Sequence, residues 1–309
     1  MTTRPTRIGL IGWGTVGAAF GQLVRQGPLP LDLAVVAVRD PARMRGTALP
    51  DGVRIGTPQE ALDADVVVEL AGGAEAPLPW ARTALAAGTP YVTANKALLA
   101  THGAELAELA AANGAALLAS ASVGGGTPML ETVAHLAATG EVARLRGIVN
   151  ATTTFICSAM GEGRSYDEAL RAAQAAGYAE ADPTFDVTGR DAAQKLAILA
   201  SVAWGRWRPE SDVETSGITG LAVAPGSTVR LVAEATVERL RVGPMELPPD
   251  DLLATVTGIG NLLAVEVAGA GTFTVSGPGA GGRVTAGAVY ADVARLLAGE
   301  RPILFRSAA

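Results

Sequence analysis

Two residues near the middle of the chain have the types and the spacing of a proton-transfer pair. Asp191 and Lys195 are four positions apart, so on a helix that begins near Gly189 they share one face. As an ordinary helix-surface ion pair they would add roughly a few tenths of a kcal/mol to stability. However, reduction of an aldehyde leaves an alkoxide that must gain a proton, and a lysine held by a carboxylate can supply it. We therefore predict that Lys195 is an acid–base residue and that Asp191 orients it.

Three further charged side chains can complete such a site. Glu180 and Asp186 are suitable acceptors for the α-ammonium group of a substrate, the alternative being an acidic surface loop. Lys96 follows an apolar run at 91–93, and the carboxyl edge of an open α/β sheet is where such folds bind their ligands. We predict that Lys96 touches the substrate or the nicotinamide ring. The alternative is an exposed lysine at the start of a helix.

A glycine-rich motif near the N-terminus predicts a dinucleotide site. Residues 12–17 form a G-x-G-x-x-G directly after a strand-like run and at the start of a helical one. The first glycine permits a tight turn, the second lets the backbone approach a pyrophosphate, and the third allows close packing of the helix. A plain glycine turn is the alternative. The predicted cofactor contacts in this motif are Gly12, Trp13, Gly14, Thr15, Val16 and Gly17.

The residues after the second and third expected strands bear on the choice of cofactor. Arg39 could pair with a 2′-phosphate, whereas Asp40 could accept a hydrogen bond from a 2′-hydroxyl, and either could be a solvated strand end. NADP and NAD both stay open, with a slight preference for NADP and with Arg39 as a cofactor residue. After the third strand, small residues around Ala71 leave room for the cofactor.

The order of the expected elements is typical of an α/β fold. Residues 1–124 are predicted to form a Rossmann domain with a doubly wound parallel sheet. Its expected strands are at 7–11, 33–38, 66–70, 91–93 and 116–119, and its expected helices at 16–25, 79–87 and 98–113.

A second domain of the α+β class, for catalysis and dimerisation, is predicted over residues 125–282. Residues 283–309, with a helix at 285–298, are expected to pack back on the first domain. The expected elements of the second domain are helices at 129–139, 166–176 and 190–204, an extended run at 142–150 and strand-rich sequence at 221–275.

Composition excludes several classes of function. The 309 residues suffice for about two domains, and 24 Lys and Arg against 30 Asp and Glu argue against a nucleic-acid partner. The single cysteine, Cys157, excludes an intrachain disulfide and favours a reducing compartment. No signal-peptide pattern opens the chain, and its longest uncharged stretch, 109–130, is interrupted by glycines and polar residues. We therefore expect a cytoplasmic protein that acts on a small molecule, without a membrane partner.

The two histidines are interpreted as structural. His102 and His135 lie in expected helices without carboxylate or serine partners. No His-based triad and no zinc motif is visible in the sequence.

In several separate blocks, the sequence resembles the homoserine dehydrogenases across nearly its whole length. The blocks are Gly12–Gly17, Val92–Lys96, Gly177–Pro183 with Asp186, Gly189, Asp191 and Lys195, and Gly277–Gly282 with Thr285 and Ala286. The resemblance implies NAD(P)-dependent interconversion of L-aspartate 4-semialdehyde and L-homoserine, in threonine and methionine biosynthesis. It also implies that Lys195 is the acid–base residue and that Asp191 assists it.

The same resemblance implies further contacts and an assembly. Lys96, Glu180 and Asp186 would help bind substrate, Thr152 would lie in the substrate pocket, and Gly281 in the closing glycine loop would contact the cofactor. Family members are usually dimers, so a homodimer is expected. Some carry a C-terminal ACT domain, and because this sequence stops at Ala309, threonine feedback through such a domain is not expected.

Two departures from the family pattern affect the predicted site. The family's glutamate beside a monovalent cation is replaced by Ser120, so any cation site would rest on the carbonyls of Val123 and Gly125. The family's Asn-Gly-Thr-Thr-Asn block carries Ala151 and Thr154 here. Two alternatives follow, namely a sister oxidoreductase for another amino-acid semialdehyde or amino alcohol, and a cofactor-binding sensor without turnover.

Overall fold

The computed structural model describes residues 4–40, 49 and 52–300. The chain divides into two compact units, one made of Met1–Gly126 with Ala280–Ala309 and one of Thr127–Gly279. The division expected from the sequence, after residues 124 and 282, differs from these limits by two and three positions. Each unit has its own six-stranded sheet.

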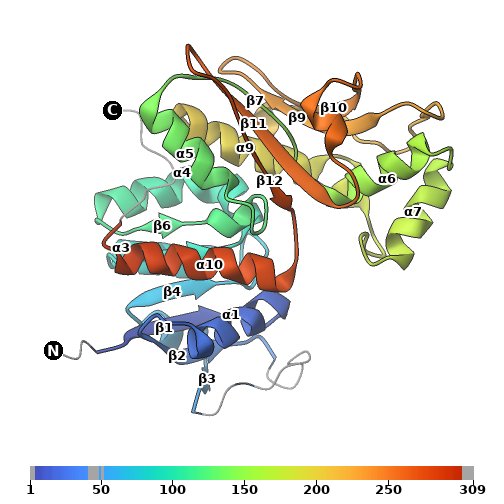
Figure 1. The fold of residues 1–309 in the computed structure, drawn as a ribbon. Coiled ribbons are helices and arrows are strands. Elements are labelled where there is room, and N and C mark those ends of the chain that lie inside the picture. Colours follow the sequence, from blue (N-terminus) through green and yellow to red (C-terminus); the bar gives the residue numbers. More distant parts are fainter. Residues whose placement is uncertain (1–3, 41–48, 50–51, 301–309) are drawn as a thin grey trace. The chain divides into compact units, whose positions relative to one another are not determined.

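A parallel sheet forms the centre of the first unit (Figure 1). Its strand order is β3-β2-β1-β4-β5-β6, and all neighbouring pairs are parallel. The strands are β1 (Thr6–Ile11), β2 (Leu31–Ala37), β3 (Arg54–Gly56), β4 (Val66–Glu69), β5 (Tyr91–Thr93) and β6 (Leu117–Leu118). The order reverses between β1 and β4, which is the doubly wound arrangement, so the predicted fold class is confirmed.

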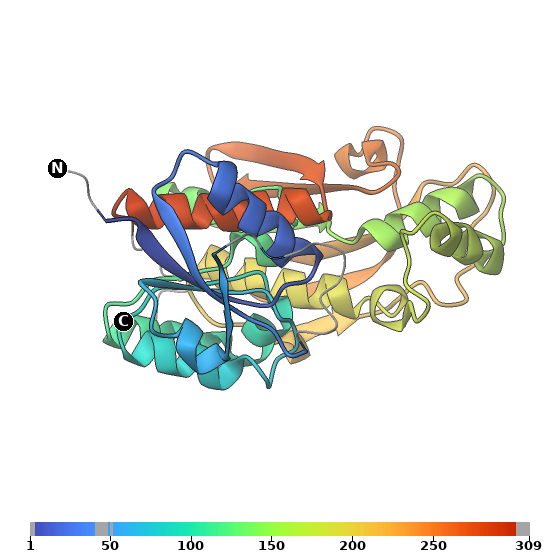
Figure 2. The same cartoon turned by 90° about the horizontal axis from the view of Figure 1, so that it is seen from below.

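Helices cover both faces of this sheet, which explains why its strands are apolar on both sides. α1 and α10 lie side by side on one face, and α3 and α4 lie on the other (Figure 2). Ile8, Phe20 and Val289 belong to the hydrophobic core between the sheet and α1 with α10. The helices are α1 (Thr15–Gln26), α2 (Pro58–Ala61), α3 (Leu78–Ala86), α4 (Lys96–Ala112), the 3-10 turn η2 (Ser120–Ser122) and α10 (Gly282–Leu297).

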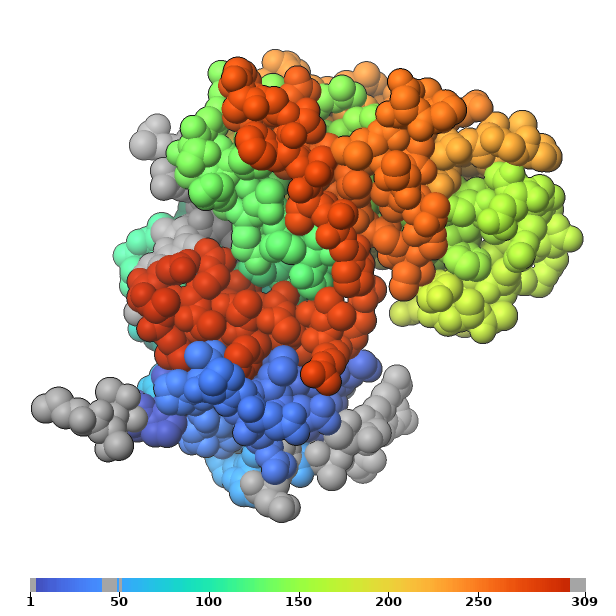
Figure 3. Space-filling view, in the orientation of Figure 1, coloured from blue at the N-terminus to red at the C-terminus, as the bar shows by residue number. Residues whose placement is uncertain are grey.

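The second unit has a mixed sheet of order β12-β11-β7-β9-β10-β8. Only the β8–β10 pair is parallel among the strand pairs described. The strands are β7 (Val142–Ile148), β8 (Val213–Thr215), β9 (Val229–Ala235), β10 (Leu240–Glu246), β11 (Gly260–Val267) and β12 (Gly271–Pro278). The edge strand β12 is largely exposed, and Figure 3 shows its orange-red atoms uncovered.

Helix α9 is the central helix of the second unit, because it contacts α5 and the strands β7, β8, β9 and β10. Most of its residues are buried. Within the part of the chain that is described, no helix has both the length and the apolar character needed to cross a membrane. The helices are α5 (Met129–Thr139), α6 (Ala151–Gly161), α7 (Tyr166–Ala175), α8 (Thr184–Val187), α9 (Arg190–Trp204) and the 3-10 turns η3 (Glu210–Asp212) and η4 (Leu252–Thr255).

The sequence pattern does not predict α6. Its first turn contains three consecutive threonines, which are β-branched and disfavour a helix. The Asn150 side chain caps the helix by accepting from the Thr153 N–H at 2.8 Å. The hydroxyl of Thr154 donates to the Asn150 carbonyl at 2.8 Å. Thr153 and Thr154 therefore satisfy their hydroxyls at the start of the helix, and the extended run expected to reach residue 150 ends at Ile148.

Candidate active site

The glycine-rich turn after β1 has the close packing that a dinucleotide turn requires. Gly12 has a φ of 107°, and a Cβ there would lie 2.7 Å from the Leu70 backbone. At Gly17 a Cβ would overlap the carbonyl oxygen of Gly12, so glycine lets α1 approach the turn. At Gly14, by contrast, no described atom lies within 4 Å of such a Cβ, and the residue is exposed. Gly14 therefore leaves open space for a ligand.

Two helix N-termini meet at this turn. Gly14 is the N-cap of α1 and Gly281 is the N-cap of α10, and neither helix has a side-chain cap. A Cβ on Gly282 would lie 2.5 Å from the Thr15 side chain, so the start of α10 lies against the turn. Uncapped N–H groups and the positive ends of two helix dipoles favour an anionic group such as a pyrophosphate.

Trp13 has different roles for its backbone and its side chain. The backbone belongs to the turn, but the indole is only 6% exposed and belongs to the hydrophobic core. A Cβ on Gly21 would lie 2.5 Å from the ring, so the indole packs over this glycine of α1. Val16 also packs against the core. Any contact of Trp13 with a cofactor would therefore come from its main chain.

The remaining predicted cofactor residues follow the carboxyl ends of neighbouring strands. Arg39 comes after β2 and is exposed, and Ala71 comes after β4 and is exposed. Lys96 comes after β5 and is the first residue of α4. Because β2, β1, β4 and β5 are successive neighbours in the sheet, these residues and the glycine turn lie along one edge. Open α/β sheets bind their ligands at this edge.

Lys195 and Asp191 form a buried ion pair on α9 of the second unit. The Lys195 Nζ donates to Asp191 Oδ2 and to the carbonyl oxygen of Val149, both at 2.7 Å. The two side chains are only 12% and 7% exposed, so the interpretation as an ordinary surface ion pair is wrong. Each charge depends on the other, because breaking a buried pair leaves one charge without compensation. An ammonium group has three N–H donors, and the described residues accept two of them.

Asn150, to which the sequence pattern assigns no role, connects this pair to a second carboxylate. Its Nδ2 donates to Asp191 Oδ2 and to Asp186 Oδ1, each at 2.7 Å. An asparagine directly before a helix is a signal for an N-cap, and Asn150 caps α6. However, no local pattern shows that its amide also lies between two aspartates 36 and 41 positions away. We call Lys195, Asp191, Asn150 and Asp186 the lysine cluster.

The lysine cluster contains more negative than positive charge. Asp186 and Asp191 contribute two carboxylates against the one ammonium of Lys195. Burial raises the pKa of Asp186, the Asn150 hydrogen bond opposes this, and the nearby charge of Asp191 raises it further. Such a cluster favours a cationic group beside Asp186, because a positive charge would hold its carboxylate in the ionised form.

Thr152 and Glu180, the other predicted substrate residues of the second unit, are not members of the lysine cluster. The Thr152 hydroxyl donates to the carbonyl oxygen of Tyr178 at 2.7 Å, which ties α6 to the segment 177–183. Glu180 is exposed in this segment. Among the residues that the structure describes, no hydrogen bond or ion pair connects its carboxylate to the lysine cluster. The fold thus brings Asp186 into the cluster and leaves Glu180 at the surface.

The loop expected to hold a cation is fixed by an aspartate. The Ser120 hydroxyl donates to Asp292 Oδ1 at 2.6 Å and its N–H donates to Oδ2 at 2.9 Å. Asp292 is 1% exposed, so this carboxylate is already engaged. Val123 is extended and Gly125 has a φ of 61°. A cation at their carbonyls would lack the carboxylate that the family has at position 120.

One histidine has a partner that the sequence did not indicate. His102 Nε2 lies 3.2 Å from Glu75 Oε1, so the expectation of no carboxylate partner is wrong. The acid is 80% exposed, however, which makes this a surface contact. His135 is exposed on α5.

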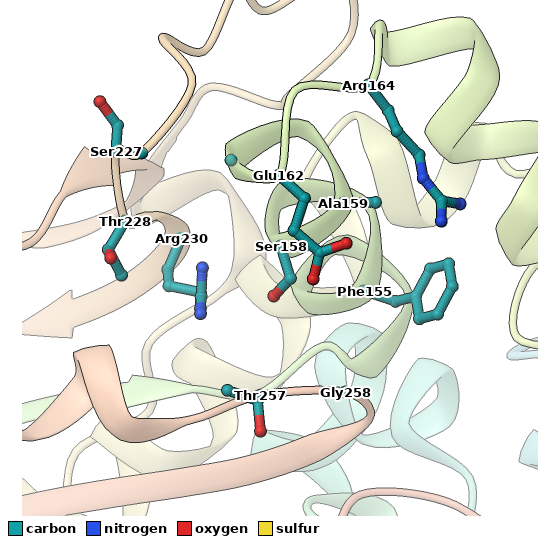
Figure 4. A pocket seen from close by; sticks show the side chains of 12 residues that line it. Phe155, Ser158, Ala159, Glu162, Arg164, Ser227, Thr228, Arg230, Thr257 and Gly258 are labelled. Carbon is teal, nitrogen blue, oxygen red and sulfur yellow. The ribbon is translucent and has the colours of Figure 1, made fainter.

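A separate pocket of about 390 Å³ lies at the C-terminal end of α6 (Figure 4). Arg230 lines it, is 5% exposed, and donates to the carbonyl oxygens of Val256 and Val229 at 3.0 and 2.8 Å. No member of the lysine cluster lines this pocket. The pocket is therefore distinct from the lysine cluster, although both belong to the second unit.

The doubly wound sheet with its glycine turn, together with a buried lysine–aspartate pair, defines the class of the protein as an NAD(P)-dependent oxidoreductase. The family model described as "Homoserine dehydrogenase, NAD binding domain" matches residues 12–120, and the model "Homoserine dehydrogenase" matches residues 128–294. The chain belongs to the homoserine dehydrogenase family.

Individual relatives agree with this assignment. The homoserine dehydrogenase of Corynebacterium glutamicum is 37% identical over 93% of this chain and 70% of the relative. The crystal structure of a homoserine dehydrogenase from Thiobacillus denitrificans matches with a TM-score of 0.89 and 34% identity, covering 96% of this chain and 75% of that one. A hyperthermophilic archaeal homoserine dehydrogenase in complex with NADPH matches with a TM-score of 0.85 and 28% identity, and the match covers 97% of this chain and 99% of that one.

Proposed function

We propose that the lysine cluster is the acid–base and substrate-binding centre for the interconversion of L-aspartate 4-semialdehyde and L-homoserine. Lys195 exchanges the proton, Asp191 positions it, and Asp186 accepts the α-ammonium group of the substrate. The observation that carries the proposal is the buried combination of one lysine with two carboxylates joined by Asn150. One carboxylate compensates the lysine, and the other suits the cationic end of an amino acid.

The reaction needs one hydride and one proton. When bound, NAD(P)H supplies the hydride to the aldehyde carbon, and NAD(P)⁺ takes it back in the oxidation of homoserine. The aldehyde oxygen then needs a proton, which the Lys195 ammonium donates. In the opposite direction the neutral amine accepts the proton of the homoserine hydroxyl. The Val149 carbonyl and Asp191 hold Nζ in place, which leaves its third N–H position for the substrate oxygen.

We also propose that NADP is the preferred cofactor. Arg39 is exposed after β2, where a Rossmann protein meets the adenosine ribose, and a guanidinium can bind a 2′-phosphate with two hydrogen bonds. The archaeal relative was crystallised with NADPH. Lys96, Ala71 and Gly281 complete the proposed cofactor contacts at the same unit.

A homodimer is part of the same proposal. The edge strand β12 is exposed, and Phe273 on it is 42% exposed, which gives a surface that a second copy could cover. Light scattering is expected to give twice the chain mass of 31.1 kDa. A mass of one chain at micromolar concentration would exclude the dimer.

The decisive experiment is homoserine oxidation with NADP and with NAD by the wild type and by Lys195→Met. We expect kcat to fall by about 10² to 10⁴ in the variant, as for the loss of an acid–base group, while cofactor binding persists. Arg190→Met is the matched control, because it removes an exposed cation from the same helix. It should keep kcat within about threefold.

The outcomes separate the alternatives. A wild type that binds cofactor but turns over neither homoserine nor any other amino alcohol would be a sensor, and a marked preference for another amino alcohol would point to a sister oxidoreductase. The buried Thr154 hydroxyl bonds within α6, so the altered block presents no new polar group from this residue.

A further inference from the structure

A buried carboxylate at the end of β4 has no role in the proposed chemistry. Glu69 is the last residue of the strand and is 0% exposed. Burial raises its pKa, which means that the site opposes the charged form. The other three residues of β4 are valines, as expected for a strand covered on both faces. An acid at such a position needs hydrogen bonds that offset its desolvation.

One oxygen of Glu69 holds the turn that follows. Its Oε1 accepts from the N–H of Ala71 at 2.7 Å and from the N–H of Gly72 at 3.1 Å. Gly72 and Gly73 have φ angles of 75° and 80°, so two successive residues are in the left-handed region. Such a turn cannot continue a strand or a helix, and the carboxylate satisfies two of its N–H groups. Ala71 is the cofactor residue predicted at this edge of the sheet.

The other oxygen connects the turn to the start of α4. Glu69 Oε2 accepts from the Thr93 hydroxyl at 2.7 Å, across neighbouring strands in register. The Thr93 oxygen accepts from the Asn95 N–H at 2.9 Å. The Asn95 side chain then donates to the carbonyl of Gly73 at 2.6 Å and caps α4 by accepting from Leu98. The hydrogen bonds therefore close a ring through Glu69, Thr93, Asn95 and the turn.

We propose that Glu69 is a positioning residue that holds the Ala71–Gly73 turn and the α4 start with Lys96 in the geometry needed to bind the nicotinamide dinucleotide. This inference rests on the proposed function of these loops as cofactor contacts. The groups that hydrogen-bond to the Glu69 carboxylate are the N–H groups of Ala71 and Gly72, the Thr93 hydroxyl and the Asn95 side chain. Each acts as a donor here, so an acceptor-only group fits the position. A glutamine would place an NH₂ against one of these donors and lose one hydrogen bond.

The test measures cofactor binding directly, by titrating NADPH and NADH separately and following their fluorescence. We expect Glu69→Gln to raise the dissociation constant about tenfold, since a buried hydrogen bond to a charged group is lost. Thr93→Val, which removes the hydroxyl with little change of shape, should raise it about fivefold. Glu108→Gln changes an exposed acid on α4 and is the matched control, expected within about twofold. The melting temperature of each variant is recorded in parallel.

A structural role alone would give a different pattern. If both variants melt at a lower temperature but bind both cofactors within about twofold of the wild type, Glu69 supports only the fold and the inference is overturned. If Glu69→Gln does not fold, Thr93→Val decides the question. The wild type could also bind cofactor without oxidising homoserine. In that case the proposed function fails while the dissociation constants still test Glu69.

Discussion

Replacing Asp186 by asparagine tests the assignment of the substrate α-ammonium group. Asparagine has nearly the same shape and keeps an oxygen that accepts from Asn150, so the variant changes mainly the charge. A hydrogen bond to a charged group contributes about 1.5 to 3 kcal/mol, which corresponds to a rise in the KM for homoserine of roughly 10- to 150-fold. Because Asp186 reaches Lys195 through Asn150 and Asp191, we expect kcat to change less than about threefold.

The assay compares two substrates in a cycle. Homoserine and 4-hydroxybutyrate differ by the α-amino group, so 4-hydroxybutyrate should be a poor substrate of the wild type. In Asp186→Asn the two substrates should differ much less in kcat/KM, because the acceptor of the ammonium is gone. Asp182→Asn is the control, since Asp182 is exposed in the same segment and its carboxylate accepts from the side chain and the N–H of Thr184, outside the lysine cluster. Equal losses of kcat/KM for both substrates in Asp186→Asn would refute the assignment.

The raised pKa of Asp186 adds a pH dependence to this prediction. Substrate binding needs the ionised carboxylate, so the KM of the wild type should rise as the pH falls through a value above the ordinary 3.8 of aspartate. The folded state also holds this proton more tightly than the unfolded chain. The contribution of Asp186 to stability therefore decreases as the pH rises from the unfolded to the folded pKa. Asp186→Asn should be at least as stable as the wild type at pH 7, and a marked loss in thermal unfolding would contradict this.

Three further predictions concern the first unit. Gly17→Ala should lower the free energy of unfolding by more than about 2 kcal/mol, because its Cβ would overlap Gly12. Gly14→Ala should change the free energy of unfolding by less than about 1 kcal/mol, but it should weaken cofactor binding about tenfold. Denaturant unfolding and cofactor titration distinguish the two; equal stability of both variants would count against the packing argument. Arg39→Ala should reduce kcat/KM for NADP about tenfold and leave that for NAD nearly unchanged, and equal effects on both would exclude 2′-phosphate binding. The rate of homoserine oxidation should differ less than about twofold between potassium, sodium and a bulky organic cation, because Ser120 is a neutral residue bonded to Asp292. A larger dependence would show that the carbonyls of Val123 and Gly125 suffice to bind a cation.

Local sequence patterns by themselves determined the limits of several helices and strands and the helix face that the Asp191–Lys195 pair shares. The helices Met129–Thr139 and Arg190–Trp204 and the strand Tyr91–Thr93 have the limits that periodicity predicts. The four-residue spacing of Asp191 and Lys195 placed them on one helix face. These features depend on neighbours within one or two turns, so the sequence contains the physical information they require.

Only the tertiary structure decided which distant groups meet. Asn150 lies between Asp186 and Asp191, Glu69 accepts from Thr93 on the next strand, and Ser120 bonds to an aspartate 172 residues away. The burial that distinguishes the Lys195 pair from a surface pair likewise depends on what packs over α9. Such pairings depend on strand order and on the path of the chain. A hydrogen bond between residues far apart in sequence leaves no periodic pattern in either segment, so local reasoning cannot find it.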